Sequence, residues 1–90
     1  MDIRVRDLRM IGKGNLKAVA DVEVGPFSVR GLRIVENGRG PFVAWPEERW
    51  LTKDGQTRYT PIVEPTREAH ETVQRAVLAA YAEKAGKPAA

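Results

Sequence analysis

Leu16-Lys17-Ala18-Val19-Ala20-Asp21-Val22-Glu23-Val24 is the clearest structural signal in this 90-residue chain. Apolar side chains stand at every second position and alternate with lysine, valine, aspartate and glutamate. A period of two is typical of a β-strand with one buried face. Because two of the apolar positions, Ala18 and Ala20, are small, we expect this face to pack closely against a helix.

Strands are also predicted on both sides of this segment. Residues 3–11 and residues 27–35 alternate in the same way, and each slips by one position, near Asp7 and at Gly31 respectively. A one-residue slip in an antiparallel strand is typical of a β-bulge. Turn-forming residues separate each segment from the next, so three strands are expected to follow one another as hairpins.

Residues 36–63 have shorter apolar stretches and are more polar than the segments before them. A turn at residues 36–41 leads into an apolar strand at residues 42–45, which Pro46 ends. Residues 47–55 are polar and charged, so we expect an exposed loop or hairpin arm there. Residues 56–63 are predicted to form a last strand.

One helix is predicted after the strands. Thr66 is a good N-cap, and Glu68 lies in the first turn. Apolar side chains then recur every three or four residues and form one helix face, consisting of Ala69, Val73, Ala76, Val77, Ala80 and Tyr81. The expected fold class is therefore α+β: a twisted antiparallel sheet of about five strands, with hairpins and bulges, and one C-terminal helix packed on it. Residues 1–85 form a single domain in this prediction, and residues 86–90 a frayed tail.

The composition limits the chemistry of the chain. It contains no cysteine and a single histidine, His70, so we expect no metal site and no cofactor. His70 has no partner nucleophile. Glu47 and Glu48, which are neighbours in the chain, lie on the predicted exposed arm, whereas paired-acid catalysis needs a buried pocket. We expect a binding protein, with no enzymatic activity and no small-molecule substrate.

The charge and size of the chain bear on its partners. The net charge is +3, and the excess lies in residues 1–60, which carry eleven Lys/Arg against eight Asp/Glu. Such a balance permits nucleic-acid binding without requiring it. A small domain without cross-links gains buried area by association, so we expect a homodimer formed through sheet edges. No apolar signal core opens the chain and no stretch approaches the roughly 18 apolar residues of a spanning helix, so a cytoplasmic location without membrane association is expected.

The candidate binding residues fall into two groups. On the predicted arm, Arg49, Lys53 and Arg58 could contact phosphates while Trp50 stacks on a base; the alternative is a solvated, charged hairpin. Five arginines of the strands could form a secondary basic face, in which Arg30 and Arg33 are the main candidates and Arg4, Arg6 and Arg9 the others. For this face the preferred interpretation is cross-strand pairing with the acidic residues Asp7, Asp21 and Glu23.

Several segments resemble, in order, a known family. Gly40-Pro41-Phe42-Val43-Ala44-Trp45-Pro46 is close to Gly-Leu-Phe-Val-Ala-Met-Pro, Asp54-Gly55 with Arg58 matches Asp-Gly-x-x-Arg, and residues 73–81 match Ile-Gln-x-Ala-Val-Leu-x-x-Tyr. With residues 17–20 and 27–35, the match spans most of residues 3–82. These segments are similar to those of the SpoVG (stage V sporulation protein G) family. The resemblance implies an α+β domain whose protomers pair through their sheets, and a nucleic-acid-binding regulator of septation, cell division, sporulation and gene expression.

One departure from the family pattern affects the site. Family members often carry Ser-Lys-Arg after the proline, and those basic residues are implicated in DNA contact. This chain has Glu47-Glu48-Arg49, so the resemblance carries over only to Arg49. Two hypotheses stay open: a dimeric regulator that binds DNA or RNA through phosphate contacts, and a protein-interaction module that affects septation without binding nucleic acid.

Overall fold

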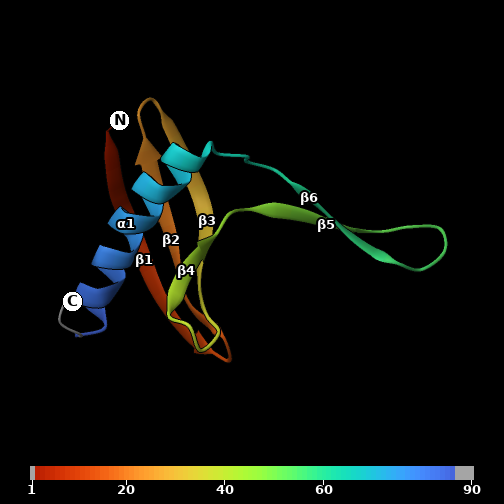
Figure 1. Cartoon of the computed structure of the whole chain (residues 1–90), viewed down its shortest axis with the longest axis horizontal. Helices are drawn as coiled ribbons and strands as arrows, with labels where there is room; N and C mark the ends of the chain where they lie inside the picture. Colours follow the sequence, from red (N-terminus) through yellow and green to blue (C-terminus); the bar gives the residue numbers. More distant parts are fainter. Residues whose placement is uncertain (1, 87–90) are drawn as a thin grey trace.

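The computed structural model describes residues 2–86, which form six strands and one helix. In chain order these are β1 (Ile3–Lys13), β2 (Leu16–Val24), β3 (Phe27–Glu36), β4 (Pro41–Ala44), β5 (Glu47–Leu51), β6 (Thr57–Pro61) and α1 (Arg67–Lys84). The first four strands form one antiparallel sheet in the order β1-β2-β3-β4, and β5 pairs only with β6. Figure 1 shows α1 lying across one face of the four-stranded sheet, with the β5–β6 hairpin projecting away from it. The α+β prediction is confirmed, with one strand more than the five expected.

Both predicted bulges are present. In the β1–β2 pairing, Val5 pairs with Val22 and Asp7 pairs with Asp21, so β1 has one extra residue, Arg6. In the β2–β3 pairing the extra residue falls between Val29 and Leu32. Gly31 lies in this second bulge with φ of 80°, a conformation that glycine adopts at low cost. The Gly31 N–H, freed from the ladder, donates to Oδ1 of Asp21 at 3.1 Å.

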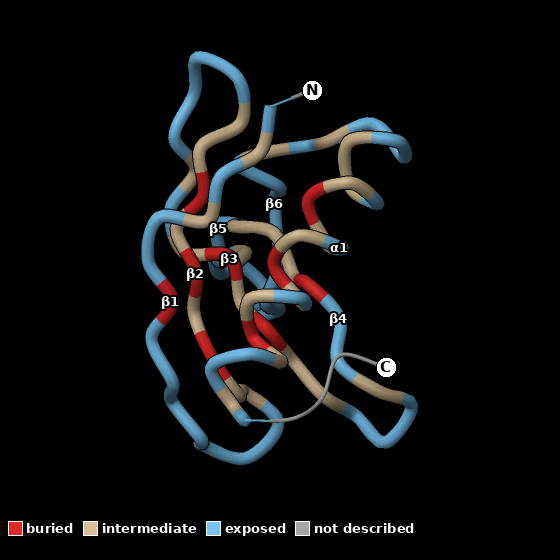
Figure 2. The backbone as a smooth tube through the Cα atoms, turned by 90° about the vertical axis from the view of Figure 1, so that its left-hand side faces the viewer, coloured by how far each residue is buried: buried red, intermediate tan, exposed pale blue. Residues whose placement is uncertain are grey.

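The core lies between α1 and the sheet. Its buried side chains come from all four strands of the sheet and from the helix, and they are Leu8, Ala18, Ala20, Val22, Leu32, Ile34, Val43, Val73, Val77 and Tyr81. Figure 2 shows that the buried segments gather where α1 covers the strands. Ala18 and Ala20 are completely buried in this core, and α1 contacts β2, as predicted.

The ends of the helix follow the sequence prediction. The Thr66 hydroxyl accepts a hydrogen bond from the Ala69 N–H at 3.2 Å, which satisfies one of the free donors of the first turn. At the other end Ala85 caps the helix and Gly86 follows with φ of 72°. The predicted frayed tail lies, apart from Gly86, outside the described residues. Within residues 2–86, no helix combines the length and apolarity needed to cross a membrane.

The projecting segment is a two-stranded hairpin, which we call the arm (residues 47–61). The prediction of an exposed loop or hairpin arm at residues 47–55 is confirmed, because β5 forms the first strand of such an arm. Every residue of β5 and β6 is exposed. The segment just before the arm is fixed to α1, because Trp45 donates from Nε1 to Nδ1 of His70 at 2.7 Å and the Val43 N–H donates to Oε1 of Gln74 at 2.9 Å.

Asp21 makes the β3 bulge sensitive to acid. The hydrogen bond from the Gly31 backbone, with a smaller contribution from Arg9, lowers the pKa of Asp21 below its ordinary value of 3.8. A lowered folded-state pKa means that the carboxylate stabilises the fold above the unfolded-state value, and that this stabilisation is lost as the pH falls through the folded-state value. We predict that the wild-type free energy of unfolding falls more steeply below about pH 4 than that of Asp21→Asn. Urea unfolding across this pH range checks the difference, and parallel curves for the two proteins would contradict it.

Candidate functional site

The pairing of β5 with β6 divides the arm into two faces. Arg49 lies directly opposite Tyr59, and Trp50 lies directly opposite Arg58. Directly opposed residues project to the same side of an antiparallel pair, and successive residues project to opposite sides. Arg49 and Tyr59 therefore share one face of the arm with Glu47, whereas Trp50 and Arg58 lie on the other.

The face that carries Arg49 and Tyr59 borders a groove beside β3. This groove, which we call the arginine groove, has a volume of about 470 Å³. Its lining comes from β3 and from the base of the arm, and consists of Arg30, Gly31, Arg33, Pro46, Glu47, Arg49 and Tyr59. The groove therefore combines the two secondary candidates, Arg30 and Arg33, with one of the primary candidates, Arg49.

The bulge at Gly31 explains why Arg30 and Arg33 reach the same groove. Residues three positions apart in a regular strand project to opposite faces of the sheet. The extra residue between Val29 and Leu32 changes this parity, so that both arginines lie on the face opposite α1. The spacing of the two arginines alone would have placed one of them on the helix side.

Most of the other charges on this open face of the sheet are paired. Arg6 lies 3.2 Å from Glu23, and Arg9 lies 2.7 Å from Asp7 and 3.4 Å from Asp21. The contacts of Arg6 with Glu23 and of Arg9 with Asp21 confirm the preferred cross-strand pairing for these two arginines, whereas Asp7 lies on the same strand as Arg9. Such exposed pairs contribute only about 0 to 1 kcal/mol each, but they lower the positive potential over β1 and β2.

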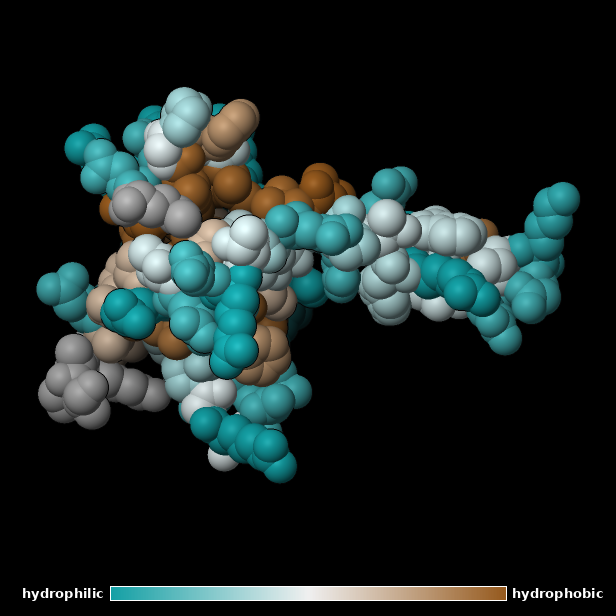
Figure 3. All heavy atoms as spheres, turned by 45° about the horizontal axis from the view of Figure 1, so that its top comes forward, coloured by the Kyte–Doolittle hydropathy of each residue, from teal (hydrophilic) through white to brown (hydrophobic). Residues whose placement is uncertain are grey.

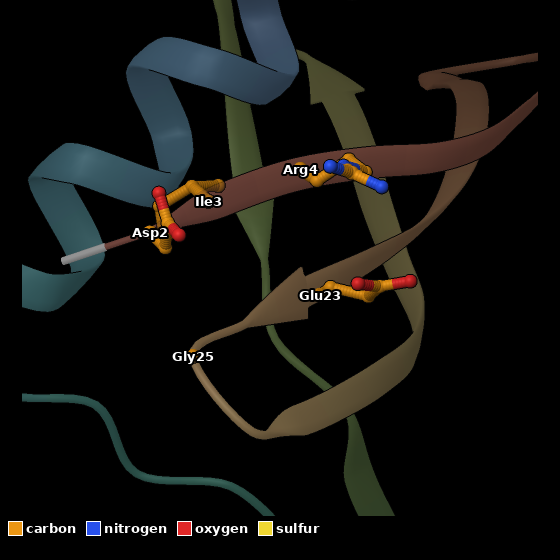
Figure 4. Close-up of a pocket in the computed structure, with 5 residues that line it drawn as sticks. All are labelled: Asp2, Ile3, Arg4, Glu23 and Gly25. Carbon is orange, nitrogen blue, oxygen red and sulfur yellow. The ribbon is translucent and has the colours of Figure 1, made fainter.

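A hollow at the end of β1 and β2 illustrates the same mixture of charges. It has a volume of about 250 Å³ and is lined by Asp2, Ile3, Arg4, Glu23 and Gly25. Figure 4 shows the side chains of Arg4 and Glu23 projecting side by side from neighbouring strands. The negative charge next to Arg4 makes this hollow a poor site for a phosphate.

The arginine groove has a different charge arrangement. Among residues 2–86, neither Arg30 nor Arg49 has a carboxylate within 4.0 Å, and Arg33 is 3.5 Å from Oε1 of Glu47. Arg33 and Glu47 are both partly exposed, so their interaction is weak. Three guanidinium groups and one carboxylate therefore line the groove. Asp21 also interacts electrostatically with Arg30, but it lies outside this lining, so the groove keeps a net positive charge.

The remaining predicted site residues lie apart from the groove. Trp50 and Arg58 are on the opposite face of the arm, where Trp50 donates from Nε1 to Oγ1 of Thr60 at 2.9 Å. Lys53 is in the loop at the tip. Over the whole arm, three basic residues, Arg49, Lys53 and Arg58, are balanced by three acidic ones, Glu47, Glu48 and Asp54.

Tyr59 is the groove residue that sequence reasoning missed. Its place next to Arg49 depends on the β5–β6 register, which in turn depends on where the tip loop begins and ends. The backbone and Oγ1 of Thr52 and the backbone of Gln56 close this loop through hydrogen bonds of 2.8 to 3.3 Å. The Asp54-Gly55 pair marked a turn, but a pair of turn residues does not specify the loop length.

A second groove is apolar. It lies between the β2–β3 turn and the start of α1, has a volume of about 330 Å³, and is lined by Val24, Phe27, Ser28, Val29, Trp45, Val63, Pro65 and Ala69. Figure 3 shows hydrophobic surface near the base of the arm, whereas the projecting arm is mostly hydrophilic or neutral. Within residues 2–86, no group of three or more His, Asp or Glu side chains is placed to hold a metal ion.

Comparison with known proteins gives a consistent result. The sequence model of the family described as SpoVG matches residues 1–83. The chain is 38% identical over 91 residues to "Putative septation protein SpoVG 1" of Listeria monocytogenes, covering 98% of this chain and 81% of the relative. It is 36% identical over 81 residues to a protein of Archaeoglobus fulgidus and 37% identical over 82 residues to one of Priestia megaterium, both named "Putative septation protein SpoVG". These alignments cover 89% of this chain in each case, and 92% and 79% of the respective relatives.

Proposed function

Since the chain belongs to the SpoVG family, we propose that it is a nucleic-acid-binding regulator that influences septation and gene expression. The observation that carries this proposal is the convergence of Arg30, Arg33 and Arg49 on one open groove. Arginine suits phosphate recognition because its planar guanidinium group donates two parallel hydrogen bonds. The role in septation is taken from the names of the relatives.

The ligand is proposed to meet the protein mainly at the arginine groove. The tip and the outer face of the arm carry Lys53 and Arg58, but the arm as a whole has no net charge. Phosphate affinity therefore depends on the base of the arm, where it adjoins β3. Lys53 and Arg58, with Trp50, are proposed as secondary contacts for a strand that extends beyond the groove.

Glu47 is proposed to weaken this binding. Its carboxylate faces Arg33 at 3.5 Å and lines the groove, so it competes with a phosphate for the same guanidinium group. Glu48 has the same charge, but it lies on the other face of the arm. The two glutamates are therefore expected to differ in their effect on binding although they are neighbours in the chain.

A homodimer formed through sheet edges is part of the proposal. β1 is an edge strand of 11 residues, and an unpaired edge of this length favours association. The arm also carries Leu51, which is 72% exposed. Ile62, the residue directly after β6, is 64% exposed. Two-stranded hairpins are only marginally stable alone, so contact with a second protomer would stabilise the arm.

A role as a protein-interaction module is the second candidate function. The apolar groove and the exposed Phe27 at its edge favour it, because hydrophobic surface of this kind is typical of protein contacts. A pull-down from the native host separates the two candidates. Recovery of nucleic acid alone would count against the protein-interaction role.

We predict that binding of a labelled oligonucleotide, followed by fluorescence anisotropy, weakens steadily between about 50 and 200 mM salt, because each phosphate contact releases counterions. Arg49→Gln should weaken binding and reduce the slope of log K against log salt by about 0.7 for a single strand. Arg75→Gln is the matched control, since Arg75 is exposed on the helix and does not line the groove. Absence of binding at low salt, or affinity that salt does not change, would refute the proposal.

We predict that Glu47→Gln tightens oligonucleotide binding about 2- to 5-fold, the effect of removing one exposed charge interaction. Glu48→Gln changes the net charge equally but removes no carboxylate from the groove, so its effect should be smaller. Anisotropy at one fixed low salt concentration measures both variants. Equal gains in affinity would indicate that only net charge matters, contrary to the proposed site.

We predict that the protein is a dimer in solution. Multi-angle light scattering should give about twice the 10.0 kDa mass of the chain. Met10→Pro, in the edge strand β1, should lower the dimer content, because alternation of the ladder turns the Met10 N–H to the unpaired edge and proline lacks the N–H that edge pairing uses. A stable 10.0 kDa species for the wild-type protein would refute the dimer.

A further inference from the structure

Tyr59 is placed beside the positive groups of the arginine groove. It lies directly opposite Arg49 across the arm, a position at which the Cβ atoms are about 4.5 to 5.5 Å apart. Its side chain is 58% exposed and lines the groove together with Arg30 and Arg33. An exposed aromatic ring among arginines in an open groove is the arrangement by which proteins hold single-stranded nucleic acid.

Tyr59 contributes little to the packing of the protein. The arm has only two strands, and every residue of both is exposed, so the ring is not part of the core. Within the described part of the chain, the Tyr59 hydroxyl makes no hydrogen bond to another side chain or to the backbone, whereas Trp50 on the opposite face is bonded to Thr60. Within residues 2–86, no hydrogen bond or core contact therefore keeps the tyrosine ring from a ligand.

The groove suits an unpaired base better than a base within a duplex. In a duplex each base is stacked on its neighbours, so a protein can reach only base edges in the grooves and the phosphates outside. A ring that lines a groove can contact the face of a base only when that base is unpaired. The volume of about 470 Å³ falls within the ~300 to 1,000 Å³ that is usual for small-ligand sites, so a single nucleotide would fit.

The arm is poorly suited to the alternative, in which it enters the major groove of duplex DNA as a β-ribbon. A two-stranded ribbon has the right dimensions for this. However, phosphates flank that groove on both sides, and the three acidic residues of the arm cancel its three basic ones. The unpaired positive charge lies at the base of the arm, where a flexible single strand can reach it.

We propose that the arginine groove binds one nucleotide of an unpaired strand, with the Tyr59 ring stacked on its base and Arg30 and Arg49 holding the flanking phosphates. This proposal rests on the proposed function and narrows its ligand to single-stranded DNA or RNA. Stacking tolerates every base, so little sequence preference is expected from this contact.

The test compares a labelled single-stranded DNA oligonucleotide, the RNA of the same sequence, and the corresponding DNA duplex by fluorescence anisotropy at one low salt concentration. At least one single strand should bind several-fold more tightly than the duplex. Tyr59→Leu should weaken single-strand binding by about 5-fold or more, the usual effect of losing one stacked base. Tyr59→Phe keeps the ring and should bind nearly as well as the wild type.

Trp50→Leu is the matched control, because it removes an aromatic side chain from the same hairpin on the face away from the groove. It should change affinity less than Tyr59→Leu. A fluorescent adenine analogue in the strand gives a second readout, since its emission should be quenched by the wild type and by Tyr59→Phe but not by Tyr59→Leu. Circular dichroism of each variant checks that the fold is retained.

The outcomes separate this inference from the proposed function. The single-strand inference is wrong if the duplex binds as tightly as the tighter-binding of the two single strands. It is also wrong if Trp50→Leu weakens binding more than Tyr59→Leu. Salt-dependent duplex binding that Arg49→Gln weakens would nevertheless support the proposed function. If neither single strands nor the duplex bind at low salt, both proposals are wrong.

Discussion

Packing of α1 on the four-stranded sheet is the interaction on which the rest of the structure depends. The helix approaches the sheet closely because Ala18 and Ala20 present no long side chains, and both are completely buried. Val73 and Val77 of α1 belong to the same core and are equally buried. Apolar burial contributes about 25 cal/mol per Å², and a chain of this size has only one core in which to obtain it.

This packing leaves the opposite face of the sheet available for binding. With a single helix to cover it, the sheet has one buried and one open face, and the open face carries the arginines. On β1, Arg6 and Arg9 are paired with carboxylates, whereas the β3 arginines lie beside the base of the arm. The site is therefore located where the arginines outnumber the carboxylates beside them.

The β3 bulge connects the fold to the site. Gly31 adopts a positive φ there, and its N–H bonds to Asp21 of the neighbouring strand. The extra residue brings Arg30 and Arg33 to the same face of the sheet, although their spacing would separate them in a regular strand. A local irregularity of the backbone thus determines the charge distribution of the open face.

The sequence by itself determined the four strands of the main sheet, the helix, both bulges and the face of the helix that is buried, but it left β5 open as a loop or a hairpin arm. These features follow from local rules: the period of two, the slip in that period at Gly31, the N-cap at Thr66 and the three-to-four spacing of the apolar residues. Only the tertiary structure decided which side chains meet at the site. Tyr59 lies beside Arg49, while Trp50 lies on the other face, because the register of β5 and β6 is set by the length of the tip loop. The groove itself exists because that hairpin starts next to β3, a relation between segments far apart in sequence that no local pattern encodes.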